Sequence, residues 1–444
     1  MAGTETVDSV AKKMLMYRWF CYGILALTYI CVYFDRVSPS VVATNIQEEF
    51  GISATALGIM SSMYFYPYAA MQIPAGFLSD SVGPRRTVSI FFAIAAIGTA
   101  VFGLAPTFAV AIVGRFMMGI GVAFVWIPCV RILGNWFRPR EFSTLMGLML
   151  TWGNVGALCA SAPLAVLVSK VGWRNAFFYL GAVMVAMAVM NALILRNKPS
   201  DKGFPTVSVI DGVDYYATGG KEVTMTVRET VPLVLKNKNF WKLAVYAFMI
   251  YGTVMGMQGL WATPYMQNVY GIEKQVAANN LMFWAIGMAL GCVVVGIFSD
   301  RILKSRRKAC LYFSIVYLIT WIPLVAAPGT WPVGLLWLQM FIMGFFCGAY
   351  VPNYAHISED MPHGAIATAS AMVNVFYFIG GAVFQTIMGR MLDSYGADES
   401  GAFSVEAYRS TFVFCFVAMI VACVMMFLTT DTQAVKRSKE SATA

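Results

Sequence analysis

The chain contains two copies of one loop sequence, and each copy joins two long apolar segments. The first copy runs from Gly76 to Arg86 and the second from Gly296 to Arg306. The similarity continues upstream without a gap, because Phe50-Gly51-Ile52 and Tyr270-Gly271-Ile272 hold corresponding positions. Repetition at one fixed offset indicates that one half of the chain is a copy of the other. Any fold for this sequence must therefore contain two similar halves.

Long apolar stretches fill most of both halves. Apolar residues make up 59% of the chain, above the roughly 45–50% of soluble domains. Each stretch has about 19–27 residues, enough for a helix to cross ~30 Å of hydrocarbon, where lipid offers the backbone no other hydrogen-bond partner. The stretches are 19–43, 54–78, 87–105, 107–130, 142–168, 174–195, 240–265, 276–299, 309–327, 332–355, 366–389 and 410–430. They predict an all-α integral membrane protein with twelve transmembrane helices in two pseudo-symmetric six-helix bundles.

The longest polar stretch lies between the sixth and seventh apolar segments and divides the chain. We predict an N-terminal bundle at 1–195, a cytoplasmic linker at 196–239, and a C-terminal bundle with its tail at 240–444. The last part of the linker, 226–239, has the pattern of a short amphipathic helix on the inner leaflet. Most of the 31 Lys and Arg fall in the N-terminus, alternate loops and the C-terminus. That side of the membrane, with both termini, is predicted to be cytoplasmic.

Charge and cysteine usage exclude several classes of protein. The net charge of +9 follows mostly from the loop asymmetry, and no soluble basic domain remains to bind nucleic acid. The nine cysteines lie in or at the ends of the apolar stretches without close pairs, which supports neither a disulfide framework nor a zinc site. Phosphate-binding loops and nucleophile motifs are absent from the sequence. We therefore expect no enzyme activity, no cofactor and no metal.

Three charged residues lie well inside the apolar stretches, namely Asp35, Arg36 and Arg115. A charge in the bilayer core costs several kcal/mol, so such groups usually face a cavity or a partner. Arg36 and Arg115 are predicted at similar depths, and Asp35 balances only one of them. An anionic substrate would balance the other. In the alternative interpretation Arg115 is structural, and Asp35 only neutralises it.

The repeated loop resembles the signature loop of the major facilitator superfamily, and the resemblance covers essentially the whole chain. Gly114 to Gly121, which contains Arg115, is similar to a fourth-helix motif of that superfamily. The resemblance implies two bundles that rock about a central site and open to one side at a time. We predict that Asp80 holds a cytoplasmic gate between the bundles, with Arg131 near the inner end of span four as its partner. The predicted gate residues are Gly76, Asp80, Gly83, Arg85, Arg86, Arg131, Gly296, Asp300 and Arg306.

A second set of residues resembles the anion:cation symporter branch of the same superfamily. It comprises Tyr33 to Ser40, Tyr68, Met71 to Gly76, and Asn135-Trp136-Phe137. The branch moves organic anions, such as sugar acids and other carboxylates, with protons or sodium. The resemblance implies that Arg36 binds the anion, that Asp35 couples transport to the cation, and that Tyr33 lines the site.

Two positions qualify the choice of branch. The symporter branch often has an acidic residue seven positions after the fourth-helix Arg, where this chain has Val122. Coupling would then depend on Asp35 alone, or the protein would exchange anions or work as a uniporter. The organophosphate branch commonly has a second Arg six positions before a Trp of span seven. Here Met255 holds that position before Trp261.

Polar side chains recur at helical spacing in several of the predicted spans. Amides and phenols there could bind a hydroxylated acid while aromatic rings pack against its carbons. The alternative role for such residues is to hold helices together. The predicted substrate-binding residues are Arg36, Arg115, Tyr33, Asn374, Gln258, Asn154 and Tyr377.

These observations predict a secondary transporter for a small organic anion such as a carboxylate or sugar acid, coupled to protons or alternatively to sodium. The expected location is a bacterial inner membrane, where the protein would span the lipid bilayer several times and act as a monomer. Two alternatives stay open. One is an organophosphate/anion exchanger, and the other is a transporter-like membrane sensor of an organic anion.

Overall fold

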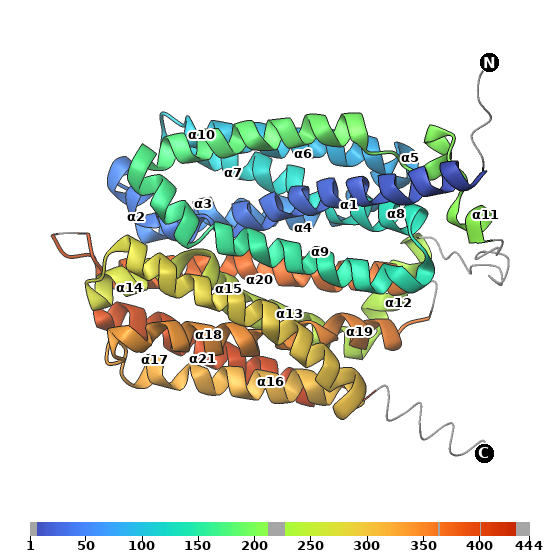
Figure 1. Cartoon of the computed structure of the whole chain (residues 1–444). Coiled ribbons are helices and arrows are strands. Elements are labelled where there is room, and N and C mark those ends of the chain that lie inside the picture. The colour runs from blue at the N-terminus through green and yellow to red at the C-terminus, as the bar shows by residue number, and fades with distance from the viewer. Residues whose placement is uncertain (1–6, 212–226, 363–364, 400, 432–444) are drawn as a thin grey trace, which may run out of the picture. The chain divides into compact units, whose positions relative to one another are not determined.

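The computed structural model describes residues 7–211, 227–362, 365–399 and 401–431, which are helical almost throughout (Figure 1). Strand pairing within these ranges is confined to one isolated bridge between Ala397 and Phe403. Ten helices in the described part of the chain are long and apolar enough to cross a membrane. The prediction of an all-α membrane protein is confirmed at this level.

The chain forms two compact units. Unit 1 is drawn from Met1–Asp35, Ala70–Gly156 and Arg174–Glu222. Unit 2 is drawn from Arg36–Ala69, Ala157–Trp173 and Val223–Ala444. Two segments of the first half of the sequence thus belong to unit 2. The bundle limits 1–195 and 240–444 with a linker at 196–239 stay a prediction.

Unit 1 holds most helices of the first half of the sequence. They are α1 (Val7–Val37), α5 (Gln72–Ser81), α6 (Pro84–Gly103), α7 (Phe108–Ala123), α8 (Trp126–Trp136), most of α9 (Pro139–Cys159), the later part of α10 (Ala162–Ile194), a 3-10 turn (Pro199–Lys202) and α11 (Val207–Asp211). Only the last two residues of α1 fall in unit 2.

Unit 2 begins with three short helices of the first half and continues with the second half. They are α2 (Pro39–Phe50), α3 (Ala54–Ser62), α4 (Phe65–Ala70), α12 (Val227–Lys236), α13 (Lys238–Gly256), a π-helical turn (Met257–Trp261), α14 (Ala262–Tyr270), α15 (Lys274–Ile297), a second π-helical turn (Phe298–Ile302), α16 (Arg306–Thr320), α17 (Ile322–Ala326), a 3-10 turn (Val333–Leu335), α18 (Leu336–Cys347), a 3-10 turn (Gly348–Tyr350), α19 (Pro352–Glu359), α20 (Ile366–Tyr395) and α21 (Val405–Phe427). The helix predicted near 226–239 is confirmed as α12.

Prolines explain why several predicted spans are broken. A proline lacks the N–H that would bond to the carbonyl four residues earlier, and its ring clashes with that carbonyl. Eight prolines each lie two to five residues after a helix end or an irregular turn. They are Pro39, Pro67, Pro74, Pro128, Pro163, Pro264, Pro323 and Pro352. The continuous helices expected from the apolar pattern are therefore interrupted at fixed places.

Two departures from the predicted spans account for a count of ten rather than twelve. The stretch 54–78 is divided by Pro67 and Pro74 into α3, α4 and α5, each too short to cross alone. The stretches 142–168 and 174–195 merge into one segment of 51 residues, Thr144–Ile194, which contains a kink at Gly172 with φ of 78°. At 1.5 Å per residue, 51 residues are enough for two crossings of ~30 Å.

Glycines allow close helix packing within each unit. In unit 1, α6 and α7 lie side by side (Figure 1), and a Cβ built at Gly98 would lie 2.7 Å from the Met118 amide nitrogen. A Cβ at Gly121 would overlap the Phe91 carbonyl. In unit 2, a Cβ at Gly344 of α18 would overlap the Trp284 carbonyl of α15. Small residues at helix contacts are the usual means by which membrane helices approach closely.

We expect Gly121→Ala to destabilise the protein, because the added methyl group forces α6 and α7 apart. The expected loss is about 1–3 kcal/mol, the usual cost of overpacking a tight contact. Thermal unfolding in detergent measures it. Gly23→Ala is the matched control, because its Cβ would meet nothing within 4 Å. Equal melting temperatures for the two variants would show that the α6–α7 contact can relax.

Candidate functional site

Asp35 and Arg115 meet in the interior of unit 1, where both are fully buried. Thr99 Oγ1 donates to Asp35 Oδ2 at 3.2 Å. Arg115 Nη1 donates to the backbone oxygen of Asp35 at 2.8 Å. That oxygen is the carbonyl that Pro39 leaves without its helical N–H partner. Arg115 therefore compensates the break after α1, which supports a structural role for it.

Tyr33 and Asn154, two further predicted site residues, also belong to unit 1. The Tyr33 ring lies 5.3 Å from that of Tyr29, between centroids, and Gly153 of α9 leaves room for it. Asn154 is 7% exposed, and its amide nitrogen donates to Leu150 O at 3.1 Å. The Asn154 Oδ1 atom has no hydrogen-bond partner among the described residues. This oxygen can accept a bond from a hydroxyl group.

Arg36 lies in unit 2, and aromatic side chains surround its guanidinium. The side chain is 3% exposed, and its Nη1 donates to the Tyr251 hydroxyl at 3.3 Å. Its Cζ lies 5.0 Å from the ring centroid of Phe378 and 5.6 Å from that of Tyr68. Cation–π contacts in a desolvated place contribute about 2 kcal/mol. These contacts stabilise the buried cation.

Tyrosine and asparagine side chains of α19 and α20 lie next to the aromatic residues that surround Arg36. The Tyr377 ring lies 5.5 Å from Tyr251, between centroids. Its hydroxyl accepts from Asn353 Nδ2 at 2.8 Å and donates to Tyr350 O at 2.9 Å. Unit 2 thus joins Arg36 to the predicted site residue Tyr377 through a layer of tyrosines.

Asn374 lies one turn before Phe378 on α20, and its Oδ1 accepts from the Tyr354 hydroxyl at 2.7 Å. The Tyr354 and Tyr377 rings are 5.2 Å apart, between centroids. Asn374 therefore contacts the same tyrosine layer.

Gln258 is buried in the π-helical turn Met257–Trp261. At regular α-helical spacing, Tyr251, Gln258, Trp261 and Tyr265 would share one face. The π turn changes the helical register, so Trp261 donates to Gln385 O at 3.1 Å and Tyr265 packs against Phe412. Of these residues, Tyr251 accepts a hydrogen bond from Arg36 Nη1.

The first repeated loop belongs to unit 1 and connects α5 to α6. Gly83 has a φ of +93°, which glycine adopts readily, and Gly76 lies in α5. The Arg85 guanidinium donates to Ala192 O, while Arg86 and Arg131 are exposed. Arg131 lines a cavity of about 440 Å³ together with Ser79 and Gly83. The predicted partner of Arg131, the Asp80 side chain, is outside the described residues.

The second repeated loop, in unit 2, forms a compact charge cluster. Arg306 pairs with Asp300 in the π-helical turn that follows Gly296 and α15. Its Nε also donates to Glu359 Oε1 at 3.0 Å, and its Nη1 to Ser299 Oγ at 3.0 Å. The cluster ties the ends of α15 and α19 to the start of α16. It confirms no gate, but it places the two predicted gate residues Asp300 and Arg306 in contact.

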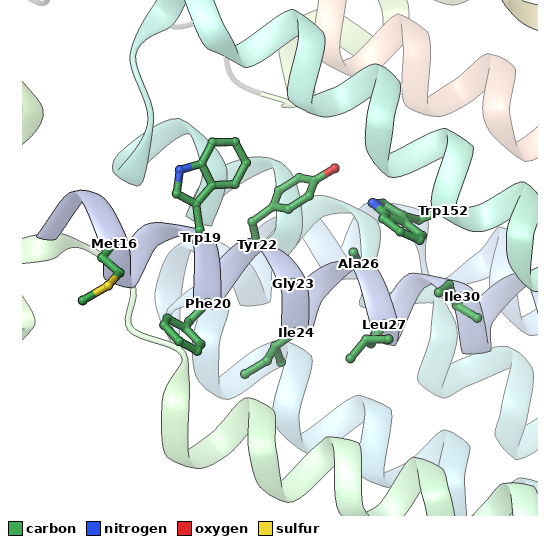
Figure 2. A pocket seen from close by; sticks show the side chains of 10 residues that line it. All are labelled: Met16, Trp19, Phe20, Tyr22, Gly23, Ile24, Ala26, Leu27, Ile30 and Trp152. Atoms are coloured by element: carbon green, nitrogen blue, oxygen red, sulfur yellow. The ribbon is translucent and has the colours of Figure 1, made fainter. Parts of the chain in front are cut away.

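An apolar groove runs along α1 in unit 1, with a volume of about 550 Å³. Figure 2 shows its lining, in which Trp152 of α9 joins side chains of α1 such as Trp19, Phe20 and Leu27. None of its lining residues carries a charge. An anion would lose its hydration there without gaining a partner, so this groove is not the anion site.

Two residues that contact the charged side chains of the candidate site, Thr99 and Phe378, were not among the predicted site residues. Thr99 gave no signal, because a single threonine in an apolar span is ordinary. Phe378 follows Asn374 by four positions, and that spacing alone placed it on the same face. His356 of α19 is fully buried, and its Nε2 lies 2.8 Å from Thr430 O.

The fold and the buried charges agree with what known proteins show. The profile of the Major Facilitator Superfamily matches residues 25–385. The chain belongs to this superfamily and is a multi-pass membrane transporter, not an enzyme. The bacterial origin of its relatives agrees with the predicted inner-membrane location.

Individual relatives are distant but cover nearly the whole chain. A probable sulfoacetate transporter of Cupriavidus necator is 26% identical over 420 residues, 90% of this chain and 95% of that protein. A glycerol-3-phosphate transporter of Bacillus subtilis is 26% identical over 421 residues, 91% of this chain and 90% of that protein. A bacterial homologue of the human lysosomal transporter Spinster has the same fold, with a TM-score of 0.75 at 18% identity, covering 93% of this chain and 96% of its own.

One ion-pair cluster of unit 1 makes stability depend on pH. Glu141 accepts from Arg18 at 2.9 and 3.2 Å and from the Arg138 N–H at 3.0 Å. Burial raises the pKa of Glu141, but the Arg138 and Arg18 hydrogen bonds outweigh burial and hold that pKa below its ordinary value of 4.5. A lowered folded-state pKa means that this stabilisation is present above the ordinary value and is lost as the pH falls.

We expect Glu141→Gln to flatten the acid side of the stability profile. The wild-type melting temperature should fall more steeply than that of the variant as the pH is lowered from about 5.5 to 4. The difference corresponds to roughly 1 kcal/mol, because the pair is partly exposed. Glu406→Gln, an exposed carboxylate, is the control. Parallel profiles for wild type and Glu141→Gln would contradict the assignment.

Proposed function

We propose that the chain is a twelve-span secondary transporter with cytoplasmic termini that carries a small organic anion into the cell by alternating access, as a monomer and in symport with protons. The observation that carries the proposal is the burial of the Arg36 guanidinium among Tyr68, Tyr251 and Phe378.

The physical argument begins with the cost of burying that cation. A charge taken out of water costs several kcal/mol unless a partner compensates it. Tyr68, Tyr251 and Phe378 stabilise the buried cation through cation–π contacts and one hydrogen bond. A carboxylate is the kind of anion that the planar guanidinium can hold bidentately. The tyrosine layer beyond Arg36 offers hydroxyl and amide groups to a hydroxylated anion.

The relatives support an anion without choosing its chemistry. One is named for an organic acid, sulfoacetate, and another for an organophosphate, glycerol 3-phosphate. Met255, buried in unit 2, holds the position where the organophosphate branch commonly has its second Arg. A single Arg suits a carboxylate or sugar acid better than a doubly charged phosphate ester. The organophosphate exchanger stays the second candidate.

Coupling to protons is assigned to Asp35. It is fully buried, and Thr99 donates to one of its carboxylate oxygens. Arg115 donates a hydrogen bond to the backbone oxygen of the same residue. Protonation of the Asp35 carboxylate would therefore change the charge next to Arg115. Sodium coupling, anion exchange and a membrane sensor are the alternatives that experiments must separate.

Purified protein in proteoliposomes tests the proposal directly. A thermal-shift screen of carboxylates, sugar acids, sulfonates and phosphate esters selects a ligand, and uptake of that ligand is then measured with imposed pH or sodium gradients. Concentrative uptake driven by protons is expected. Binding without uptake would indicate a sensor, and uptake only against an internal anion would indicate an exchanger.

Arg36→Lys keeps the positive charge but loses the planar pair of donors. We expect the affinity for the anion to fall about tenfold or more, equivalent to about 1.4 kcal/mol. Titration by thermal shift measures the affinity, and an unchanged elution profile shows that the fold persists. Arg409→Lys, on an exposed arginine, is the control. Unchanged affinity would remove Arg36 from the site.

Asp35→Asn mimics a permanently protonated carboxyl group. We expect it to abolish uphill, pH-driven uptake and to retain counterflow exchange, since exchange does not require the empty carrier to return deprotonated. Uptake and counterflow in the same proteoliposomes measure the two modes. Glu399→Gln, at an exposed carboxylate, should behave as wild type. Wild-type uptake that ignores a pH gradient would instead leave Asp35 as a structural residue beside Arg115.

A further inference from the structure

Unit 2 contains hydrogen bonds that join segments of the first half of the sequence to the second half. Ser40 and Thr263 hydroxyls lie 3.1 Å apart. Lys274 Nζ donates to Asn45 Oδ1, and Gln275 Nε2 donates to Ala162 O at 3.3 Å. These contacts explain why 36–69 and 157–173 belong to unit 2.

Asp393 also joins the two halves of the sequence, and its carboxylate accepts two hydrogen bonds. Its Oδ1 accepts from the Ala54 N–H at 2.8 Å and its Oδ2 from the Thr55 N–H at 2.7 Å. Ala54 and Thr55 begin α3, so a side chain of α20 caps a helix that lies 339 and 338 residues away in sequence. A carboxylate at a helix N-terminus is favoured by both its hydrogen bonds and the helix dipole.

The backbones of α3 and α20 are in close contact below this cap. A Cβ at Gly58 of α3 would lie 2.5 Å from Gln385 O, and a Cβ at Gly389 would overlap Ala54 O. Both glycines therefore let the two helices approach to backbone distance. The cap and the two glycines form one continuous contact along the end of α20.

This contact lies far from the residues assigned to the anion. Asp393 follows Phe378 by fifteen positions on α20, which is about 22 Å along the helix. It is also far from the Arg306 cluster. Glu359 of that cluster precedes the start of α20 at Ile366, whereas Asp393 lies in the last turn before Tyr395. The α3–α20 contact is thus at the end of unit 2 opposite the second repeated loop.

We infer that Asp393 is a positioning residue of the transport cycle, which holds the outer gate closed by capping α3 while Gly58 and Gly389 seat the helices together. The inference rests on the proposed alternating access. For the path to open on this side, α3 has to leave α20, and water must then replace the carboxylate at the Ala54 and Thr55 N–H groups. Water can satisfy the Asp393 carboxylate and the two N–H groups once the helices part. This capping contact, which we call the latch, can therefore form and break reversibly.

A labelling experiment that needs no substrate tests the inference. Ser61, fully buried in α3, is changed to Cys as the reporter, and a membrane-impermeant maleimide is applied to the outer face of right-side-out vesicles. Asp393→Asn removes the charge, and Gly389→Ala separates the helices without touching it. Each should increase the labelling rate by about threefold or more, because each raises the outward-open population. The same variants with Ser61 intact give the background from native cysteines.

Each variant has a matched control. Glu399→Gln and Gly147→Ala match the two changes, since Glu399 is exposed and a Cβ at Gly147 meets nothing within 4 Å. If either variant folds with a wild-type melting temperature and labels at the wild-type rate, the latch is rejected. Increased labelling only from the inner face would also reject it. Faster outer labelling without uptake of any organic acid would instead support the latch and reject the proposed function.

Discussion

A polypeptide backbone in hydrocarbon has no water with which to form hydrogen bonds, so each helix interruption exposes groups that something else must satisfy. Prolines create these interruptions at Pro39, Pro67, Pro264 and Pro352, among others. The residues of the candidate site gather at the same places. Tyr68 lies on the short helix between two breaks, Gln258 lies in the π-helical turn, and the carbonyl of Tyr350 in a 3-10 turn accepts from Tyr377. Proline placement thus positions the polar chemistry of this protein.

Two consecutive residues near the end of α1, Asp35 and Arg36, have different surroundings. The Asp35 carbonyl, left without a helical donor, binds Arg115, and its carboxylate binds Thr99. Arg36, one residue later, has aromatic neighbours that belong to unit 2. Consecutive side chains of a helix point about 100° apart, so Asp35 and Arg36 face different neighbours. The end of α1 therefore places the Asp35 carboxylate next to Thr99 in unit 1 and the Arg36 guanidinium among aromatic rings in unit 2.

The sequence predicted the superfamily and the helical class, because duplicated loops and apolar length are properties of composition and spacing. It also singled out Asp35, Arg36 and Arg115, since a charge in an apolar stretch is visible without coordinates. It failed where packing decides. The contact between Arg115 and a backbone carbonyl, the cover that Phe378 gives Arg36, and the register change at Met257–Trp261 depend on neighbours distant in sequence. The prolines that break the spans were visible, but apolar averaging over about twenty residues conceals their effect.

The cap on α3 has a consequence for how the protein is made. The Ala54 and Thr55 N–H groups are satisfied by a residue that the ribosome adds more than three hundred positions later. Until α20 has been made, water has to satisfy these two N–H groups. The start of the second apolar stretch therefore obtains its protein partner only from the eleventh.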